Sequence, residues 1–276
     1  MKLVSFRRPD GAARWGIAKE HGVVDLGARA PSLRHALWAT PALADEAVHH
    51  VDYGFDDIAF LPPIPDPDKV LCVGLNYMTH ILEGGREPPK QPIIFTRFAN
   101  TQVGHLQPMI RPRASETFDF EGELAVVIAR RCRHVAREDA TSVIAGYACY
   151  NDGSVREWQR HSTQFTPGKN FPATGGFGPY LVTADEVKDI KAQTLTTRVN
   201  GVVKQQAQID LMIFDIPALI TYISGFTRLN AGDVIVTGTP GGVGAARTPP
   251  EFMRAGDVCE IEITGVGTLR NVVKAG

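Results

Sequence analysis

Residues 118–128 read Phe118-Asp119-Phe120-Glu121-Gly122-Glu123-Leu124-Ala125-Val126-Val127-Ile128. The second half of this stretch is apolar and rich in β-branched residues, which predicts a strand that enters a buried core. On a strand, Glu121 and Glu123 point to the same face, about 6–7 Å apart along the chain. Two carboxylates placed in this way are costly to bury unless a cation lies between them. The pair therefore favours a divalent-cation site, although an exposed strand end facing water would show the same pattern.

The composition is that of an ordinary globular protein. Of the 276 residues, 43% are hydrophobic and 21% are charged, so we expect a sizeable core. A formal net charge of −1 gives no indication of a nucleic-acid partner or of an anionic membrane surface. The four cysteines lie far apart without the paired spacing of a zinc site, which predicts reduced thiols. Because no segment resembles a signal peptide or a membrane span, we expect a cytoplasmic protein without a membrane partner.

The first quarter of the chain and the remainder differ in pattern. Residues 1–60 predict a small N-terminal α+β domain, with a helix from Ser32 to Ala39 that stops at Pro41. Residues 61–68 contain four prolines, which exclude a helix or a central strand and indicate a stiff linker. Residues 69–276 then form the predicted catalytic domain.

Strand patterns dominate this large domain. They show no regular βαβ alternation, so we expect a mixed, β-rich α+β fold, rolled or sandwiched around one core. The Asn200-Gly201 pair predicts a hairpin between two of the strands. Helices are predicted at residues 138–146, from about Ser154 onward, and at residues 217–225.

Asp152 is a candidate for the third ligand of the cation. It stands where a predicted strand ends and a helix begins, and Arg156 and Gln159 follow at i+4 and i+7 on one helical stripe. An acid, a guanidinium and an amide on one face suit a metal ion beside an anionic substrate. A helix cap at Asp152 with Arg156 as its i,i+4 partner explains the same spacing, and both interpretations stay open.

Two further segments carry groups that can act on a substrate. His80 and Glu83 are spaced i,i+3, so one helical turn would bring them together and make His80 a general base. Lys169 lies in a segment rich in Gly and Pro and could stabilise an oxyanion. A surface pair and a surface lysine are the alternatives. The glycine-rich residues 237–244 lack the ending of a Walker loop, but their N–H groups and the Thr239 hydroxyl could hold a carboxylate.

Taken together, these segments resemble the fumarylacetoacetate hydrolase family from about residue 69 to the C-terminus. The matching segments, in family order, are Val73–Tyr77 with His80, Asp119–Leu124, Asn151-Asp152 with Arg156 and Gln159, Gly168–Phe171, Gly178-Pro179, Met212–Phe214 and Gly232–Pro240. One such match would be weak, whereas the ordered series is specific.

The resemblance implies a rolled, mixed β fold that is usually dimeric and that binds an α-keto acid. It implies a Mg²⁺, Mn²⁺ or Ca²⁺ ion held by Glu121, Glu123 and Asp152. It also implies that His80 is the general base and that Glu83 is its partner. The positions that would bind the keto acid or stabilise its enolate are Tyr77, Arg156, Gln159, Lys169 and Thr239.

One departure concerns the loop after Lys169. Many family members have Gly-Lys-x-Phe-Asp-Thr there, whereas this chain has Pro172 and Ala173 in the last two places. A hydroxyl that can support the metal shell is lost unless Thr174 replaces it, which puts substrate choice in this loop in question.

We therefore expect a divalent-metal-dependent hydrolase that cleaves a C–C bond in an acylpyruvate-type β-diketo acid, such as fumarylpyruvate, to pyruvate and a carboxylic acid. His80 would activate water and Lys169 would stabilise the pyruvate enolate. An isomerase or decarboxylase of a 2-hydroxymuconate- or oxaloacetate-type acid could use the same residues. A metal-stabilised protein without activity and a nucleotide-binding protein are the remaining classes, and His80 and Lys169 argue against the first of these.

Overall fold

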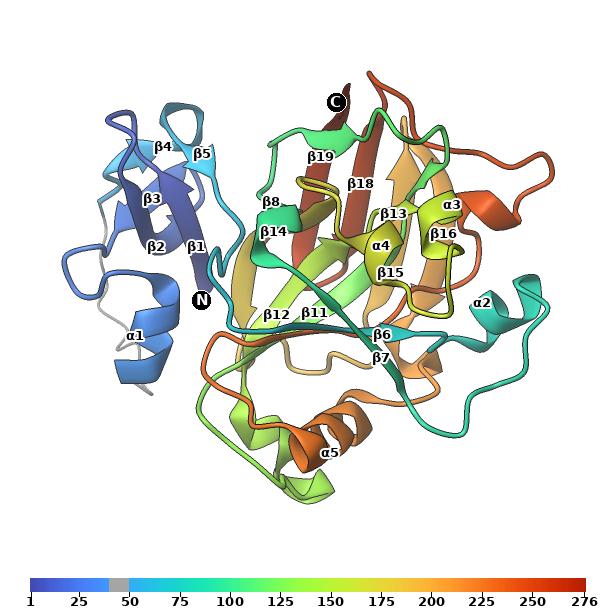
Figure 1. Cartoon of the computed structure of the whole chain (residues 1–276). Helices are drawn as coiled ribbons and strands as arrows, with labels where there is room; N and C mark the ends of the chain where they lie inside the picture. The colour runs from blue at the N-terminus through green and yellow to red at the C-terminus, as the bar shows by residue number, and fades with distance from the viewer. Residues whose placement is uncertain (40–49) are drawn as a thin grey trace.

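The computed structural model describes residues 1–39 and 50–276, so Pro41 lies outside the described residues. Figure 1 shows a small N-terminal part beside a larger, strand-rich part. No helix in the described residues is long and apolar enough to span a membrane. The chain is a mixed, sheet-rich α+β protein, as predicted, and its largest sheet is open, with β4 and β7 at the two ends of its strand order.

The largest sheet contains twelve strands, of which ten follow the order β4-β3-β2-β1-β14-β12-β11-β17-β6-β7. Its strands are β1 (Lys2–Arg7), β2 (Ala13–Lys19), β3 (Gly22–Asp25), β4 (Tyr53–Gly54), β5 (Ala59–Phe60), β6 (Val70–Gly74), β7 (Ile93–Arg97), β8 (Gln102–Val103), β11 (Gly122–Ile128), β12 (Ile144–Asn151), β14 (Gly175–Thr183) and β17 (Val234–Val236).

A second sheet contains five strands in the order β16-β15-β18-β19-β9. They are β9 (Met109–Arg111), β15 (Thr194–Val199), β16 (Val202–Gln208), β18 (Val258–Ile263) and β19 (Gly267–Ala275), and a separate pair joins β10 (Phe118–Asp119) to β13 (Ser154–Val155).

The helices are short. The α-helices are α1 (Leu33–Ala39), α2 (Met78–Glu83), α3 (Arg156–Gln159), α4 (Thr166–Lys169) and α5 (Ile216–Phe226). The 3-10 helices are η1 (Phe55–Asp57), η2 (Ala99–Thr101), η3 (Arg137–Val143), η4 (Ile209–Leu211) and η5 (Gly244–Ala246).

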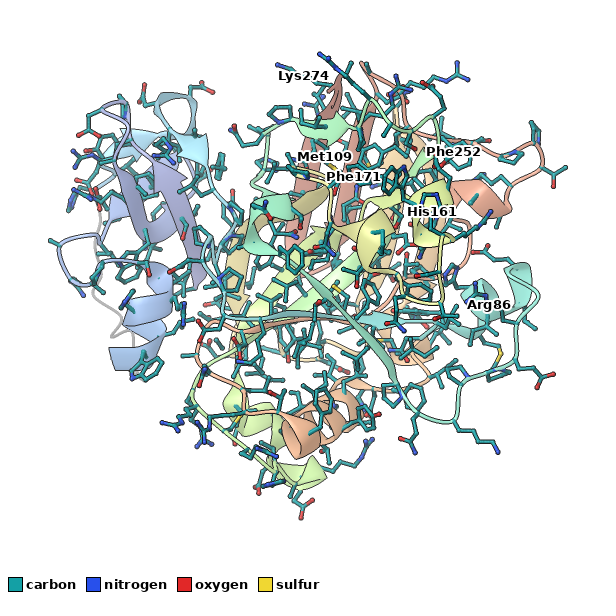
Figure 2. The ribbon with its side chains drawn as sticks, in the orientation of Figure 1. Arg86, Met109, His161, Phe171, Phe252 and Lys274 are labelled. Carbon is teal, nitrogen blue, oxygen red and sulfur yellow. The ribbon has the colours of Figure 1, made fainter. Side chains whose placement is uncertain are left out.

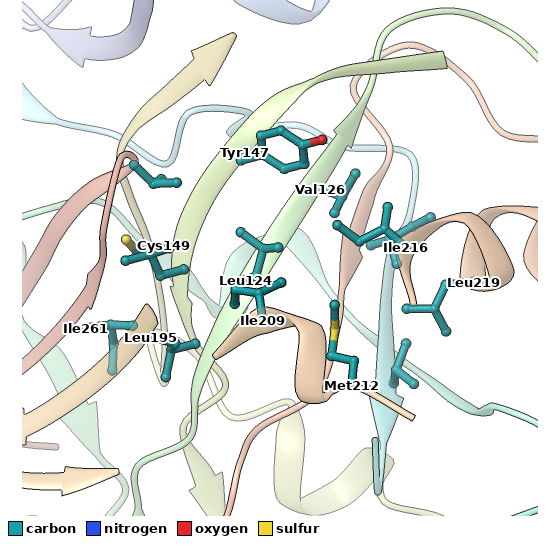
Figure 3. Packing of buried hydrophobic residues seen from close by; sticks show 14 of the residues in the cluster. Leu124, Val126, Tyr147, Cys149, Leu195, Ile209, Met212, Ile216, Leu219 and Ile261 are labelled. Carbon is teal, nitrogen blue, oxygen red and sulfur yellow. The ribbon is translucent and has the colours of Figure 1, made fainter. Parts of the chain in front are cut away.

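Strand β11 lies at the centre of the molecule and is buried along its whole length. Because successive side chains of a strand point to opposite faces, its residues divide between two cores. Leu124 and Val126 pack in the core between the two sheets, which Figure 3 shows in detail. Ala125 and Val127 pack in a second core, on the other face, with residues of the N-terminal part. A strand covered on both faces is held firmly, which suits a strand that carries site residues at its start.

The N-terminal part joins the large sheet directly. Strand β1 pairs antiparallel with β14, with Leu3 opposite Leu181. Residues 61–68 contain neither a helix nor a strand, in agreement with the proline content. The two parts therefore share one continuous sheet, and the domain boundary at residues 61–68 stays a prediction.

Among the local predictions, the hairpin is confirmed and two of the helices are wrong. The hairpin turns at Asn200 and Gly201, which have positive φ angles of 51° and 78°, as a type I′ turn requires. The helix predicted at residues 138–146 is the 3-10 helix η3, and β12 begins at Ile144 because its backbone pairs with β11. The helix predicted from Ser154 is reduced to the four residues of α3, because Ser154 and Val155 pair with β10.

Candidate active site

The three predicted metal ligands meet at one end of the β11–β12 pair. Glu121 immediately precedes β11, Glu123 is its second residue, and Asp152 follows the last residue of β12. The antiparallel register sets Gly122 opposite Asn151, and the Asp152 N–H donates to the Glu121 carbonyl at 2.9 Å. One carboxylate oxygen from each of the three residues lies within 4.8 Å of the others, and all three are buried.

Two cationic side chains are buried among these carboxylates. Lys169 Nζ lies 2.7 Å from Glu121 Oε2 and 2.6 Å from Asp152 Oδ2. Arg156 Nη1 lies 2.6 Å from Glu121 Oε1. Burial alone would raise the pKa of Glu121. The positive charges of Lys169 and Arg156, with a smaller contribution from His80, outweigh burial and lower this pKa to about 2. Glu121 is therefore an anion throughout the physiological range.

Asp152, Arg156 and Gln159 do not lie on one helix as predicted, although all three lie at the site. Asp152 lies before β13, outside α3, and the residue that caps α3 is Val155, which makes no side-chain cap. Arg156 also does not pair with Asp152, because its Nε lies 2.8 Å from Asp119 Oδ2. Gln159 Oε1 accepts from Arg156 Nη1 at 2.9 Å. Asp152 is neither a helix cap nor an i,i+4 partner of Arg156.

Arg97, at the end of β7, is a site residue that the sequence did not reveal. Its side chain is fully buried, and its Nη1 lies 2.5 Å from Asp152 Oδ1. Nη2 donates to Thr174 Oγ1 at 2.8 Å, and that hydroxyl donates to the Phe171 carbonyl at 2.7 Å. Thr174 thus holds Arg97, which in turn pairs with Asp152. The available signal was a charged residue that closes an apolar strand.

The charges of this buried network do not cancel. It contains four carboxylates, on Asp119, Glu121, Glu123 and Asp152, and three cationic side chains, on Arg97, Arg156 and Lys169. Glu123 makes no ion pair in the described part of the chain, and its Oε2 accepts the Gly238 N–H at 2.6 Å. Burial, Asp152 and Glu121 accordingly raise the pKa of Glu123 well above its ordinary value.

A divalent cation fits this arrangement. The three converging groups offer hard oxygen ligands, which Mg²⁺, Mn²⁺ and Ca²⁺ prefer, and with all four carboxylates ionised the network has one negative charge in excess. Glu121, Glu123 and Asp152 would hold the ion. The surplus positive charge that a divalent ion brings would then be matched by an anionic substrate.

The predicted base and its partner form a pair on α2. His80 Nδ1 lies 2.7 Å from Glu83 Oε1, as the i,i+3 spacing predicts. Glu83 Oε2 in turn accepts the Gly242 N–H at 2.6 Å. With Nδ1 held by the carboxylate, Nε2 is the nitrogen left to exchange a proton.

The glycine-rich loop holds carboxylates of the protein itself. Its N–H groups at Gly238, Gly242 and Gly244 donate to Glu123, Glu83 and Asp119 respectively. Gly238 has a φ of 101°, and a Cβ atom there would lie 2.8 Å from Asn76 Cβ, so glycine is required. The loop thereby joins the carboxylate cluster to the His80–Glu83 pair.

Thr239 lines the active-site cavity, whereas Tyr77 does not. The Thr239 hydroxyl donates to the Gly122 carbonyl at 2.9 Å and accepts from Gln205 Nε2 at 2.8 Å. Gln205, which the sequence did not reveal, also accepts the Gly122 N–H at 2.9 Å. Tyr77 is almost completely buried and does not line the cavity described below, and its hydroxyl has no hydrogen-bond partner among the described residues. A substrate contact by Tyr77 stays a prediction.

A cavity of about 740 Å³ connects these groups to solvent. The predicted site residues that line it are His80, Glu83, Glu121, Glu123, Arg156, Gln159, Lys169 and Thr239. Asp152 lies behind Glu121 and Lys169, to which it is joined by hydrogen bonds. A base, paired carboxylates and two cations thus face one space that a small acid can enter.

Comparison with known proteins identifies the family of this chain. Residues 69–274 match the model of the fumarylacetoacetate hydrolase C-terminal family. The chain is 37% identical over 287 residues to the mitochondrial oxaloacetate tautomerase fahd2 of Xenopus laevis, covering 99% of this chain and 90% of that protein.

The chain is also similar over its whole length to solved structures. A fumarylacetoacetate hydrolase from Exiguobacterium antarcticum superposes with a TM-score of 0.85 at 34% identity, and all of both chains is covered. A 5-carboxymethyl-2-hydroxymuconate delta-isomerase from Mycobacterium smegmatis superposes with a TM-score of 0.83 at 30% identity, again over all of both chains. This chain belongs to the fumarylacetoacetate hydrolase family.

Proposed function

We propose that this protein catalyses keto–enol tautomerisation of an oxaloacetate-type 2-oxo acid. The observation that carries the proposal is the His80–Glu83 pair in the same cavity as the buried carboxylates and Lys169. Similarity over nearly the whole chain to an oxaloacetate tautomerase supports this choice over the acylpyruvate hydrolase that the sequence favours.

The inner end of the cavity suits the 2-oxo carboxylate end of such an acid. Arg156 Nη2 is buried and has no hydrogen-bond partner among the described residues, so it is free to donate to a substrate oxygen. Lys169 contributes a second buried positive charge, fixed by Glu121 and Asp152. A divalent cation, when bound by Glu121, Glu123 and Asp152, would polarise the 2-oxo carbonyl.

His80 is positioned to move the proton. Glu83 holds Nδ1, and Nε2 accepts a proton from C3 of the keto acid while the C–H electron pair forms the C2–C3 double bond. The charge that develops on O2 is stabilised by the positive charge of Lys169. Protonation of O2 by water then gives the enol, His80 returns its proton to the solvent, and no bond between carbon atoms is broken.

The test uses protein stripped with EDTA and reloaded with Mg²⁺ or Mn²⁺. The decay of enol-enriched oxaloacetate is followed by its absorbance, while pyruvate and CO₂ are assayed in the same sample. We expect metal-restored enol decay without pyruvate. Metal-restored release of pyruvate and CO₂ at the rate of enol decay would instead establish a decarboxylase and overturn the proposal.

Hydrolysis of an acylpyruvate is the second candidate. The same dyad can draw a proton from water, and a cavity of about 740 Å³ admits a longer acid than oxaloacetate. Incubation with acetylpyruvate or fumarylpyruvate distinguishes the two functions, because only hydrolysis adds water and releases pyruvate with a carboxylic acid.

A further inference from the structure

Gly122 separates two of the candidate metal ligands, Glu121 and Glu123, so its backbone sets the spacing of their side chains. On one side, β11 pairs with β12, and Gly122 lies opposite Asn151. On the other side, β17 pairs with β11 only from Ala125 to Val127. At Gly122, β11 therefore has no neighbouring strand on this second side within the described part of the chain.

Side chains take the place of the missing strand. Gln205 Oε1 accepts the Gly122 N–H at 2.9 Å, and the Thr239 hydroxyl donates to the Gly122 carbonyl at 2.9 Å. Gln205 Nε2 donates to the same hydroxyl and to the Pro240 carbonyl, in both cases at 2.8 Å. These contacts close a ring of hydrogen bonds around Gly122, in which the Gln205 amide acts as the backbone of a neighbouring strand would.

The second sheet holds this amide against β11. Gln205 lies on β16, and Thr197 is its partner in register on β15. A Cβ atom at position 122 would lie 2.0 Å from Thr197 Oγ1, so this close approach requires glycine. Because Gln205 is buried and makes three hydrogen bonds, its amide is held in one orientation.

The opposite side of the same stretch is held by a strand and by a side chain together. The Glu121 N–H donates to Asn151 Oδ1 at 3.1 Å, next to the β11–β12 pairing. Asn151 Nδ2 lies 3.6 Å from the sulfur of Met109, which Figure 2 labels among the side chains of the large part. The side at Gln205 has only side-chain contacts to Gly122 in the described residues, so loss of the amide would loosen the stretch there.

We propose that Gln205 is a positioning residue, which fixes the spacing of Glu121 and Glu123 and thereby raises the preference of the site for Mg²⁺ relative to Ca²⁺. Mg²⁺ requires near-ideal ligand geometry, whereas Ca²⁺ accepts flexible and irregular sets of oxygen ligands. Glutamates on a fixed backbone suit the first ion, and glutamates on a loosened backbone suit the second. The inference rests on the cation site of the proposed function and goes beyond it, because it concerns the choice of ion.

The test measures the affinities for Mg²⁺ and Ca²⁺ by calorimetry, with EDTA-stripped full-length protein at a temperature where each variant is folded. Gln205→Met keeps a side chain of similar volume and removes the amide. We expect the Mg²⁺ affinity to fall by a factor of about 10–100, and the ratio of Mg²⁺ to Ca²⁺ affinity to fall about tenfold. Partial unfolding alone would lower both affinities by the same factor and leave this ratio unchanged.

Thr239 gives a second test of the hydrogen-bonded ring. Thr239→Val keeps the shape of the side chain and removes the hydroxyl, so it should lower the affinity ratio as Gln205→Met does. Thr239→Ser keeps the hydroxyl and should retain the wild-type ratio. Combining Gln205→Met with Thr239→Val should lower the ratio by less than the product of the single effects, because both changes break one ring.

A matched control removes a different amide from the same strand. Gln206 is exposed, and its Nε2 donates to Thr196 Oγ1 at 3.3 Å, outside the ring. Gln206→Met should therefore retain the wild-type affinities for both ions.

The outcomes separate this inference from the proposed function. An unchanged ratio in Gln205→Met, or an equal fall in Gln206→Met, would overturn the positioning role. Binding of neither ion by the wild-type protein would overturn both the inference and the proposed cation site. The expected fall in a protein that does not tautomerise oxaloacetate would support the inference and remove the proposed reaction, whereas tautomerisation with an unchanged ratio would have the opposite meaning.

Discussion

Replacing Arg97 with methionine tests the support behind Asp152, one of the three candidate metal ligands. The guanidinium bonds Asp152 Oδ1 at 2.5 Å, the Gly153 carbonyl at 3.0 Å and Thr174 Oγ1 at 2.8 Å, all of them buried. Removing one partner of a buried ion pair costs about 3–5 kcal/mol. Because Lys169 keeps its bond to Asp152 Oδ2, we expect a loss of about 3 kcal/mol, at the lower end of this range.

The same change should weaken the binding of metal. A residue that orients a ligand without touching the ion typically contributes a factor of about 10–100 in affinity. The free energy of unfolding is measured by urea denaturation in EDTA, and Mn²⁺ affinity by calorimetry at a temperature where the variant is folded. Arg97→Lys keeps the charge but not the fork of donors, so it should recover part of the affinity.

Arg131→Met is the control for the loss of an exposed arginine and should behave as the wild type in both assays. If Arg97→Met bound Mn²⁺ with wild-type affinity, Arg97 would not position Asp152, whatever the change in stability. Wild-type stability together with wild-type affinity would refute the reasoning from the buried contacts altogether.

Three further changes test other parts of the account. His80→Asn should lower turnover by about 10²–10⁴ with Mn²⁺ affinity unchanged, and wild-type turnover would exclude His80 as the base. Glu123→Gln removes the carboxylate that has no ion-pair partner in the described residues. In urea denaturation, the metal-free variant should be more stable than the wild type, and Mg²⁺ should no longer stabilise it. A loss of metal-free stability would contradict the charge imbalance. Burial, with a contribution from Arg270, lowers the pKa of His105 from its ordinary value of 6.5 to about 4, so unfolding takes up a proton between these pH values and stability should fall as the pH drops through this window. In urea denaturation at successive pH values, His105→Asn should make stability depend less on pH. An unchanged pH dependence would assign it to other groups.

The sequence predicted which carboxylates meet better than it predicted the local structure that carries them. Glu121, Glu123 and Asp152 come together as expected, because a strand and its antiparallel neighbour were both evident from apolar runs. The helical stripe behind Arg156 was wrong, since Ser154 and Val155 pair with β10, a contact that depends on residues distant in sequence. Residues that do lie together were thus identified partly for the wrong geometric reason.

What the sequence could not supply are contacts between distant segments. Arg97 reaches Asp152 across 55 residues of chain, and Gln205 reaches Gly122 across 83. Neither Arg97 nor Gln205 belongs to a local sequence motif. The sequence does not distinguish a buried arginine from a surface arginine when the pairing of the surrounding strands is not known. The glycine-rich loop was ambiguous for a similar reason, since the acceptors of its N–H groups lie elsewhere in the chain.

The most direct test of the central claim is solvent-deuterium incorporation at C3 of oxaloacetate, followed by NMR with Mg²⁺-loaded protein. Metal-free protein, Mg²⁺ alone and Mg²⁺-loaded His80→Asn are the references. We predict that the loaded wild-type protein accelerates incorporation well beyond all three references, without release of pyruvate. Incorporation at the rate of Mg²⁺ alone, or equal acceleration by His80→Asn, would contradict proton transfer by His80 at this site.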